Sequence, residues 1–298
     1  PQNQKHFTSL QFFPNKPYKT LYSLDSNVPQ IISRKVTIMS ETNLPFNEKF
    51  YPTKARITNG EKLQQEWEKS IKNPTDFWAE KAEAIDWIKK WDKVLDDTNP
   101  PFYQWFKGGI LNVSYNTLDR HIKTPKKNQL AYIWEGELGE TKTYTYYQLY
   151  KEVNKLAKTL KELGIKKGDR VAVYLPVIPE LPITLLATAR LGGIHAVVFS
   201  GFSAEALADR INDSSAKILV TADGSYRRGK TVAIKDNADR ALQNTPTIQK
   251  VIVVKRTGQP IQMQPNRDIW YHDALDKAGA TAYVEPEPMQ ATDPLFIL

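Results

Sequence analysis

Residues 192–230 read GGIHAVVFSGFSAEALADRINDSSAKILVTADGSYRRGK, and two short apolar runs in them enclose a segment of helical periodicity. The runs His195–Phe199 and Ile218–Ala222 have the length and β-branched content of buried strands, and residues 203–213 repeat apolar side chains at helical spacing. The pattern predicts a strand–helix–strand unit. In sheets built from such units, ligands bind at the edge where the carboxyl ends of the strands lie.

Small, polar and cationic residues follow both predicted strands. Ser200-Gly201 comes after the first strand, and Arg227-Arg228-Gly229-Lys230 comes shortly after the second. Glycine allows a ligand to approach the backbone, Arg offers a planar pair of donors to phosphate, and Lys adds a point charge. These residues predict a phosphate-binding edge of the sheet, although a cationic turn in water has the same composition.

Strand and helix patterns alternate on both sides of this unit. Strands are predicted at 170–175 and 250–255, and helices at 146–163, 179–191, 232–243 and 269–278. Thr145 is the expected N-cap of the helix over 146–163, and a hairpin from Ala131–Glu135 to Thr141–Thr145 precedes it. The predicted fold class is α/β, with a mostly parallel sheet covered by helices in layers.

The chain before this alternation has a different composition. Residues 60–107 are rich in aromatic residues, and their spacing predicts a helical segment that includes Glu61–Ile71 and a second helix from Thr75. Residues 1–38 are rich in Asn, Gln, Ser and Pro and lack amphipathic periodicity, and Met39 looks like an initiator. We therefore expect residues 1–38 to be upstream sequence or a disordered extension.

The composition excludes several classes of protein. The 298 residues contain no cysteine, which rules out disulfides and thiolate chemistry and fits a reducing, cytoplasmic compartment. No apolar run is long enough to cross a bilayer. The net charge of +8 could indicate nucleic acid, but beyond residue 38 the 36 basic and 32 acidic residues are mixed along the chain. We expect small-molecule partners, and neither nucleic acid nor a membrane.

No common catalytic motif is present in the sequence. It contains no Walker loop, no dinucleotide fingerprint after a strand, no nucleophile elbow and no metal-ligand spacing. Asp119-Arg120-His121 is predicted to form structural hydrogen bonds and ion pairs, and His195 to lie in the core. From the residues alone we predict an α/β domain with a phosphate-binding edge, without catalytic residues or metal ligands.

A series of longer motifs occurs in a fixed order between Trp105 and Lys230. The motifs are WFKGGILNVSYN, LDRH, LPVIPEL, ARLGGIHAVVFSGFS, TADG and RRGK. Their order and spacing resemble those of the AMP-forming acetyl-CoA synthetases, in the adenylate-forming acyl-CoA synthetase superfamily. The resemblance runs from about Phe77 to Leu298. It implies that residues 39–125 are the helical N-terminal segment of these enzymes and residues 126–298 the first part of their AMP-binding domain.

The resemblance implies a reaction and a role for each candidate residue. Acetate and MgATP would give acetyl-adenylate, and CoA would then take the acetyl group, with Mg²⁺ and most ATP contacts outside this chain. Arg227 and Lys230 are the expected cations near the CoA 3′-phosphate, with Arg228 and Gly229 shaping the loop. The segment expected against the CoA adenine comprises Phe199, Ser200 and Gly201.

Two departures and several alternatives accompany the resemblance. Lys230 stands where the family usually has Arg, and Ser200 stands where Gly is usual. In the family the ATP phosphate loop, acyl pocket and catalytic lysine lie beyond the position of Leu298, so we expect a truncated N-terminal fragment that is inactive alone. Propionyl- or 3-hydroxypropionyl-CoA synthetase is the alternative enzyme, and a non-catalytic CoA- or nucleotide-binding module is the alternative class.

Overall fold

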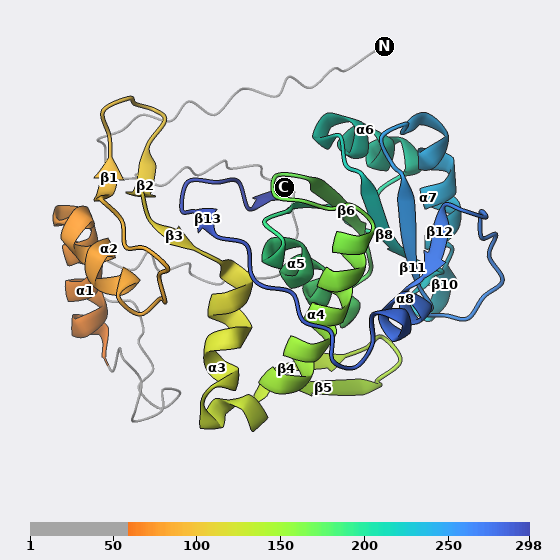
Figure 1. The fold of residues 1–298 in the computed structure, drawn as a ribbon, viewed down its shortest axis with the longest axis horizontal. Coiled ribbons are helices and arrows are strands. Elements are labelled where there is room, and N and C mark those ends of the chain that lie inside the picture. The colour runs from red at the N-terminus through yellow and green to blue at the C-terminus, as the bar shows by residue number, and fades with distance from the viewer. Residues whose placement is uncertain (1–58) are drawn as a thin grey trace, which may run out of the picture. The chain divides into compact units, whose positions relative to one another are not determined.

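The largest sheet of the described residues has six strands in the order β12–β11–β8–β6–β7–β14, and Figure 1 shows β6, β8, β11 and β12 of this sheet side by side. The strands are β6 (Arg170–Tyr174), β7 (Ile194–Val197), β8 (Ile218–Ala222), β11 (Lys250–Val254), β12 (Asp268–Trp270) and β14 (Phe296–Ile297). Every neighbouring pair is parallel. The computed structural model describes residues 59–298, and it confirms the predicted α/β class with a parallel sheet.

The chain divides into the units Pro1–Glu66 and Trp67–Leu298. Of the first unit, only residues 59–66 are described. The expectations for residues 1–38 and for residues 39–58 therefore lie outside the described residues.

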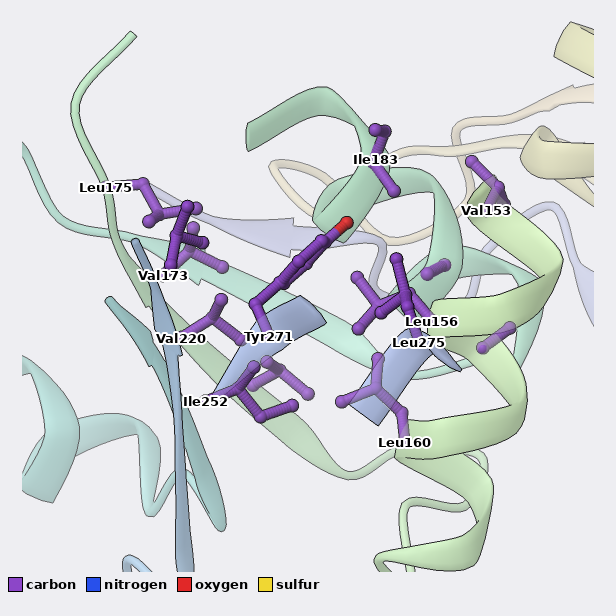
Figure 2. Packing of buried hydrophobic residues seen from close by; sticks show 14 of the residues in the cluster. Val153, Leu156, Leu160, Val173, Leu175, Ile183, Val220, Ile252, Tyr271 and Leu275 are labelled. Carbon is purple, nitrogen blue, oxygen red and sulfur yellow. The ribbon is translucent and has the colours of Figure 1, made fainter. Parts of the chain in front are cut away.

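Helices cover both faces of the sheet because successive residues of the central strands face opposite sides. On β6, Val171 and Val173 belong to one apolar core, whereas Ala172 and Tyr174 belong to the other. The first core contains residues of α4 (Tyr146–Glu162), α5 (Glu180–Arg190) and α8 (Tyr271–Ala278). Figure 2 shows Tyr271 of this core among side chains from the strands and from α4. The second core contains residues of α6 (Ala204–Ser214) and α7 (Ile234–Ala241).

The boundaries of α4 follow from its sequence. Thr145 Oγ1 accepts a hydrogen bond from the Gln148 N–H at 3.2 Å, and Gln148 Oε1 accepts one from the Thr145 N–H at 2.9 Å. This reciprocal capping box supplies partners for donors that the first turn of a helix leaves free. Leu149, Val153, Leu156 and Leu160 are all buried. The predicted N-cap is therefore confirmed.

The aromatic segment at 60–107 is less helical than its spacing predicts. Its helices are α1 (Gly60–Lys72) and α2 (Pro74–Ala82), after which β1 (Lys93–Asp96) and β2 (Gln104–Lys107) form an antiparallel hairpin. Trp87 and Trp91, four residues apart, pack edge to face at 5.0 Å outside any helix, and both contact Phe106 of β2. A ring cluster joined to a hairpin therefore produced the same spacing as a helix.

Several short elements connect this segment to the sheet domain. They are β3 (Ile110–Leu111), the π-helix η2 (Tyr115–Asp119), α3 (Arg120–Ile122), the 3₁₀ helix η3 (Pro125–Asn128), and the hairpin of β4 (Leu130–Glu135) and β5 (Thr141–Thr145). A second 3₁₀ helix, η4 (Leu242–Asn244), follows α7. β3 pairs antiparallel with β13 (Met289–Gln290), which lies between β12 and β14 in the chain.

Asp119 has the structural role that the sequence predicts. Its carboxylate accepts two hydrogen bonds from the Arg190 guanidinium, at 2.7 and 2.9 Å, and both residues are buried. Arg190 also donates to the Val284 carbonyl, and its guanidinium lies over the rings of Tyr150 and Tyr283. This buried pair ties η2 to the end of α5.

Among the described helices, none is long and apolar enough to cross a membrane.

Candidate functional site

A cleft of about 390 Å³ lies at the carboxyl ends of the central strands. The segments that follow β6, β7, β8 and β11 all contribute to its wall, and the tip of the β4–β5 hairpin contributes a further side. Its lining residues are Trp134, Glu135, Gly136, Glu137, Pro176, Val177, Ile178, Phe199, Ser200, Gly201, Ser225, Tyr226, Arg227, Val232, Ile234, Asn237 and Arg256. The cleft therefore occupies the edge of the sheet where parallel α/β folds bind ligands.

The cationic tetrapeptide is the turn of a small hairpin and not an open loop. β9 (Ser225–Arg227) and β10 (Lys230–Val232) pair antiparallel, and only Arg228 and Gly229 connect them. Both connecting residues have positive φ, +51° and +72°, as a type I′ turn requires. Glycine adopts this region freely, whereas Arg228 does so at a cost.

The hairpin register places two cations side by side. Arg227 pairs directly with Lys230, and directly opposed residues of an antiparallel pair project from the same face. Arg227 lines the cleft, whereas Lys230, Arg228 and Gly229 are not among its lining residues. Of residues 227–230, Arg227 therefore lies in the cleft wall, and Lys230 lies beside Arg227.

Phe199, Ser200 and Gly201 lie beside Arg227 in the cleft wall. The Arg227 guanidinium is 5.9 Å from the centre of the Phe199 ring, a cation–π distance. All three residues line the cleft. A Cβ atom on Gly201 would be 2.7 Å from Phe199 Cε1 and 3.2 Å from Arg227 Nη1. The backbone at Gly201 is thus packed against the side chains of Phe199 and Arg227, both of which the sequence predicts as site residues.

If the cleft of the complete gene product binds CoA, as the resemblance implies, Gly201→Ala should raise KM for CoA about threefold to tenfold, the effect of one lost cation–π contact, without unfolding the protein. The added methyl group collides with the Phe199 ring, which is 56% exposed and can swing outward, so the lost interaction is the Phe199–Arg227 contact. Steady-state kinetics at saturating ATP and acetate measure the change. In a Phe199→Ala background the same substitution should add little, because the colliding ring is gone; an equal further rise would contradict this reading.

Arg256 is a cleft residue that the sequence reasoning missed. Its guanidinium lies over the rings of Trp134 and Tyr226, 5.1 and 5.0 Å from their centres, and it forms an ion pair with Glu140. The hydrogen bond from Arg256 lowers the pKa of Glu140. Arg256 therefore joins the β4–β5 hairpin to β9, and its charge is neutralised by a carboxylate.

A buried carboxylate fixes the backbone of Arg256. Asp223, directly after β8, accepts hydrogen bonds from the N–H groups of Arg256, Thr257 and Gly258 at 2.7 to 2.9 Å. Arg256-Thr257-Gly258 follows the predicted strand at 250–255. The rule that ligands bind at the carboxyl ends of parallel strands therefore also predicts Arg256 as a site residue. Trp134 and Glu137 had no such signal, since they come from a hairpin outside the central sheet.

The described residues offer no ligand set for a divalent cation. Among residues 59–298, no three His, Asp or Glu side chains gather closely enough to hold a metal ion. His121 packs against Tyr146, and His195 stacks on Phe296 of the neighbouring strand β14. Burial lowers the pKa of His195. Both histidines therefore have packing contacts away from the cleft.

Comparisons with known families cover nearly all of the described chain. The profile of the AMP-binding enzyme family matches residues 118–298, and that of the acetyl-coenzyme A synthetase N-terminus matches residues 63–117. The first match begins in η2 and includes the entire cleft.

Three individual proteins that also match this chain are acyl-CoA synthetases by name. The chain is 52% identical over 240 residues to an acetyl-coenzyme A synthetase of Methanothrix thermoacetophila, covering 80% of this chain and 36% of that protein. It is 49% identical over 236 residues to a 3-hydroxypropionyl-coenzyme A synthetase of Sulfurisphaera tokodaii, covering 78% and 35%. An acetoacetyl-CoA synthetase structure from Streptomyces lividans matches with a TM-score of 0.68 and 28% identity, over 78% of this chain and 35% of that one.

Proposed function

Because this chain belongs to the AMP-binding enzyme family, we propose that its cleft binds CoA in an acetate–CoA ligase that forms AMP. The chain spans 36% to 41% of the length of the first curated relatives, so this activity is proposed for the complete gene product. The observation that carries the proposal is the cluster of Arg227, Phe199 and Gly201 at one cleft wall. It combines a phosphate-binding cation, an aromatic face and an accessible stretch of backbone.

The proposed reaction has two steps. An acetate oxygen attacks the α-phosphorus of ATP, which forms acetyl-adenylate and releases pyrophosphate. The CoA thiol then attacks the acetyl carbon, loses its proton and forms the thioester, and AMP leaves. Orientation of the bound reactants is a large part of such catalysis, and the residues described here contribute to it by holding the nucleotide end of CoA.

The roles of the cleft residues follow from their chemistry. Arg227 supplies a planar donor pair to the CoA 3′-phosphate, and the neighbouring Lys230 adds a second positive charge. The exposed Phe199 ring and the Ser200-Gly201 backbone offer a surface for adenine. Arg228 and Gly229 form the turn that joins the two cations. Mg²⁺ would accompany ATP, but the described residues hold no ligand set for it, so we assign it no step.

The acid substrate is proposed to be acetate. Acetyl-coenzyme A synthetases recur among the relatives, at 43% to 52% identity. The 3-hydroxypropionyl-coenzyme A synthetase of similar identity makes 3-hydroxypropionate the second candidate. We also propose that the partners are small molecules and that the protein acts in the cytoplasm, which its cysteine-free composition fits.

Assays of the complete gene product test this function. We expect acid-dependent exchange of pyrophosphate into ATP, and CoA-dependent release of AMP, with the highest kcat/KM for acetate over propionate and 3-hydroxypropionate. Higher kcat/KM for 3-hydroxypropionate would favour the second candidate. CoA binding without exchange for any of the three acids would overturn the ligase and favour a binding module.

A further inference from the structure

Glu137, at the tip of the β4–β5 hairpin, contacts the turn of the β9–β10 hairpin. Its Oε1 accepts a hydrogen bond from the Arg228 backbone N–H at 2.6 Å, between residues 91 apart in the sequence. Within residues 59–298, Glu137 is the only side chain that hydrogen-bonds to Arg228 or Gly229. The contact therefore anchors a cationic turn to a separate part of the fold.

This turn needs an anchor. Arg228 has φ +51°, a conformation that disfavours residues with a Cβ atom. A carboxylate that accepts its N–H stabilises that conformation, since hydrogen bonds to charged acceptors are stronger than neutral ones. Arg227 precedes the turn directly and pairs with Lys230 across it. The geometry of the turn thus sets where both cations lie.

The two carboxylates of the hairpin tip have different surroundings. Glu140 forms an ion pair with Arg256, which neutralises it. Glu137 forms no ion pair within the described part of the chain, although it lines the same cleft as Arg227. An unneutralised carboxylate at the edge of a phosphate site repels phosphate. The charge of Glu137 therefore weakens anion binding. Its hydrogen bond to the Arg228 N–H must favour binding by more than this repulsion opposes it.

We propose that Glu137 is a positioning residue for CoA: by holding the Arg228 N–H, it fixes the β9–β10 turn and directs Arg227 into the cleft. This inference rests on the proposed function of the cleft. It assigns Glu137 no contact with substrate. Its effect reaches CoA through Arg227, so it should appear in KM for CoA and not in adenylate formation.

Two substitutions separate the hydrogen bond from the charge. Glu137→Gln keeps a side-chain oxygen acceptor and loses the charge, whereas Glu137→Ala loses both. We expect Glu137→Ala to raise KM for CoA about threefold to tenfold, the effect of one hydrogen bond. We expect Glu137→Gln to stay within about twofold of the unmodified enzyme, because the weaker neutral hydrogen bond is offset by the loss of a charge that repels phosphate. Acetate-dependent exchange should be unchanged in both, and the rise should persist at 0.5 M salt, where exposed charges are screened (~4 Å Debye length).

A charge control and a double variant complete the test. Asp236→Ala removes an exposed carboxylate of α7 that neither lines the cleft nor contacts the turn, and it should leave KM for CoA within about twofold. In an Arg227→Ala background, Glu137→Ala should have almost no further effect, because coupled residues are not additive.

The outcomes distinguish this inference from the proposed function. If Glu137→Ala and Glu137→Gln both lower KM, and salt removes the difference, Glu137 is only a repelling charge and the inference is wrong. The same holds if Arg227→Ala raises KM but Glu137→Ala does not. If Arg227→Ala itself leaves KM for CoA unaltered, the proposed function of the cleft is what fails.

Discussion

Arg227→Ala is expected to raise KM for CoA about tenfold to a hundredfold while acetate-dependent exchange of pyrophosphate into ATP stays nearly constant. A hydrogen bond to a charged group contributes about 1.5–3 kcal/mol, which corresponds to that range. The guanidinium lines the cleft and lies over Phe199. The expected loss is confined to the CoA step because adenylate formation precedes CoA binding in the proposed reaction.

Steady-state kinetics of thioester formation and isotope exchange measure the two steps separately. Arg210→Ala is the matched control, since the Arg210 guanidinium lies 4.6 Å from the centre of the Phe202 ring but outside the cleft lining. That control should leave KM for CoA within about twofold, as expected of a surface substitution. Equal losses of exchange and thioester formation in Arg227→Ala would show that Arg227 acts on the whole site and not on CoA.

Asp119→Ala is expected to destabilise the protein by about 3–5 kcal/mol, the cost of removing one partner of a buried ion pair. The Arg190 side chain has no exposed surface, and two hydrogen bonds from it go to Asp119. Without the carboxylate, a guanidinium would lie unpaired in the core between Tyr150 and Tyr283. Such a loss is a large fraction of the free energy of unfolding of a typical domain, which is about 5–15 kcal/mol.

Urea unfolding followed by tryptophan fluorescence measures this effect. Asp213→Ala removes an exposed carboxylate from the last turn of α6, where a negative charge is mildly unfavourable, so its midpoint should stay constant or rise slightly. If Asp119→Ala unfolds at the same urea concentration as the unmodified protein, the Asp119–Arg190 pair contributes nothing to stability, and a structural role for Asp119 is wrong.

The sheet domain could be predicted because its signals are local. The strand patterns at 170–175, 218–222 and 250–255 correspond to β6, β8 and β11 within one residue at each end. Continuous apolar runs of that length are typical of strands buried on both faces. The position of the phosphate-binding edge followed from the same pattern, because carboxyl ends of parallel strands lie together.

The detailed shape of the cleft could not be predicted from those signals. The β9–β10 hairpin has strands of three residues and a non-glycine residue at positive φ in its turn, so it reads as a loop. Glu137 reaches Arg228 across 91 residues of sequence, and no local pattern encodes that contact. At the other end of the chain, Trp87 and Trp91 gave helical spacing in a segment whose packing is tertiary.

Binding of the CoA 3′-phosphate by Arg227 is tested by the preference of the complete enzyme for CoA over 3′-dephospho-CoA, measured before and after Arg227→Ala. If Arg227 binds the 3′-phosphate, the unmodified enzyme should show KM for dephospho-CoA about tenfold or more above that for CoA, and the substituted enzyme should scarcely distinguish the two. If Arg227→Ala raises KM equally for both ligands, Arg227 does not contact the 3′-phosphate, and the proposed role of this cleft in binding the nucleotide end of CoA is wrong.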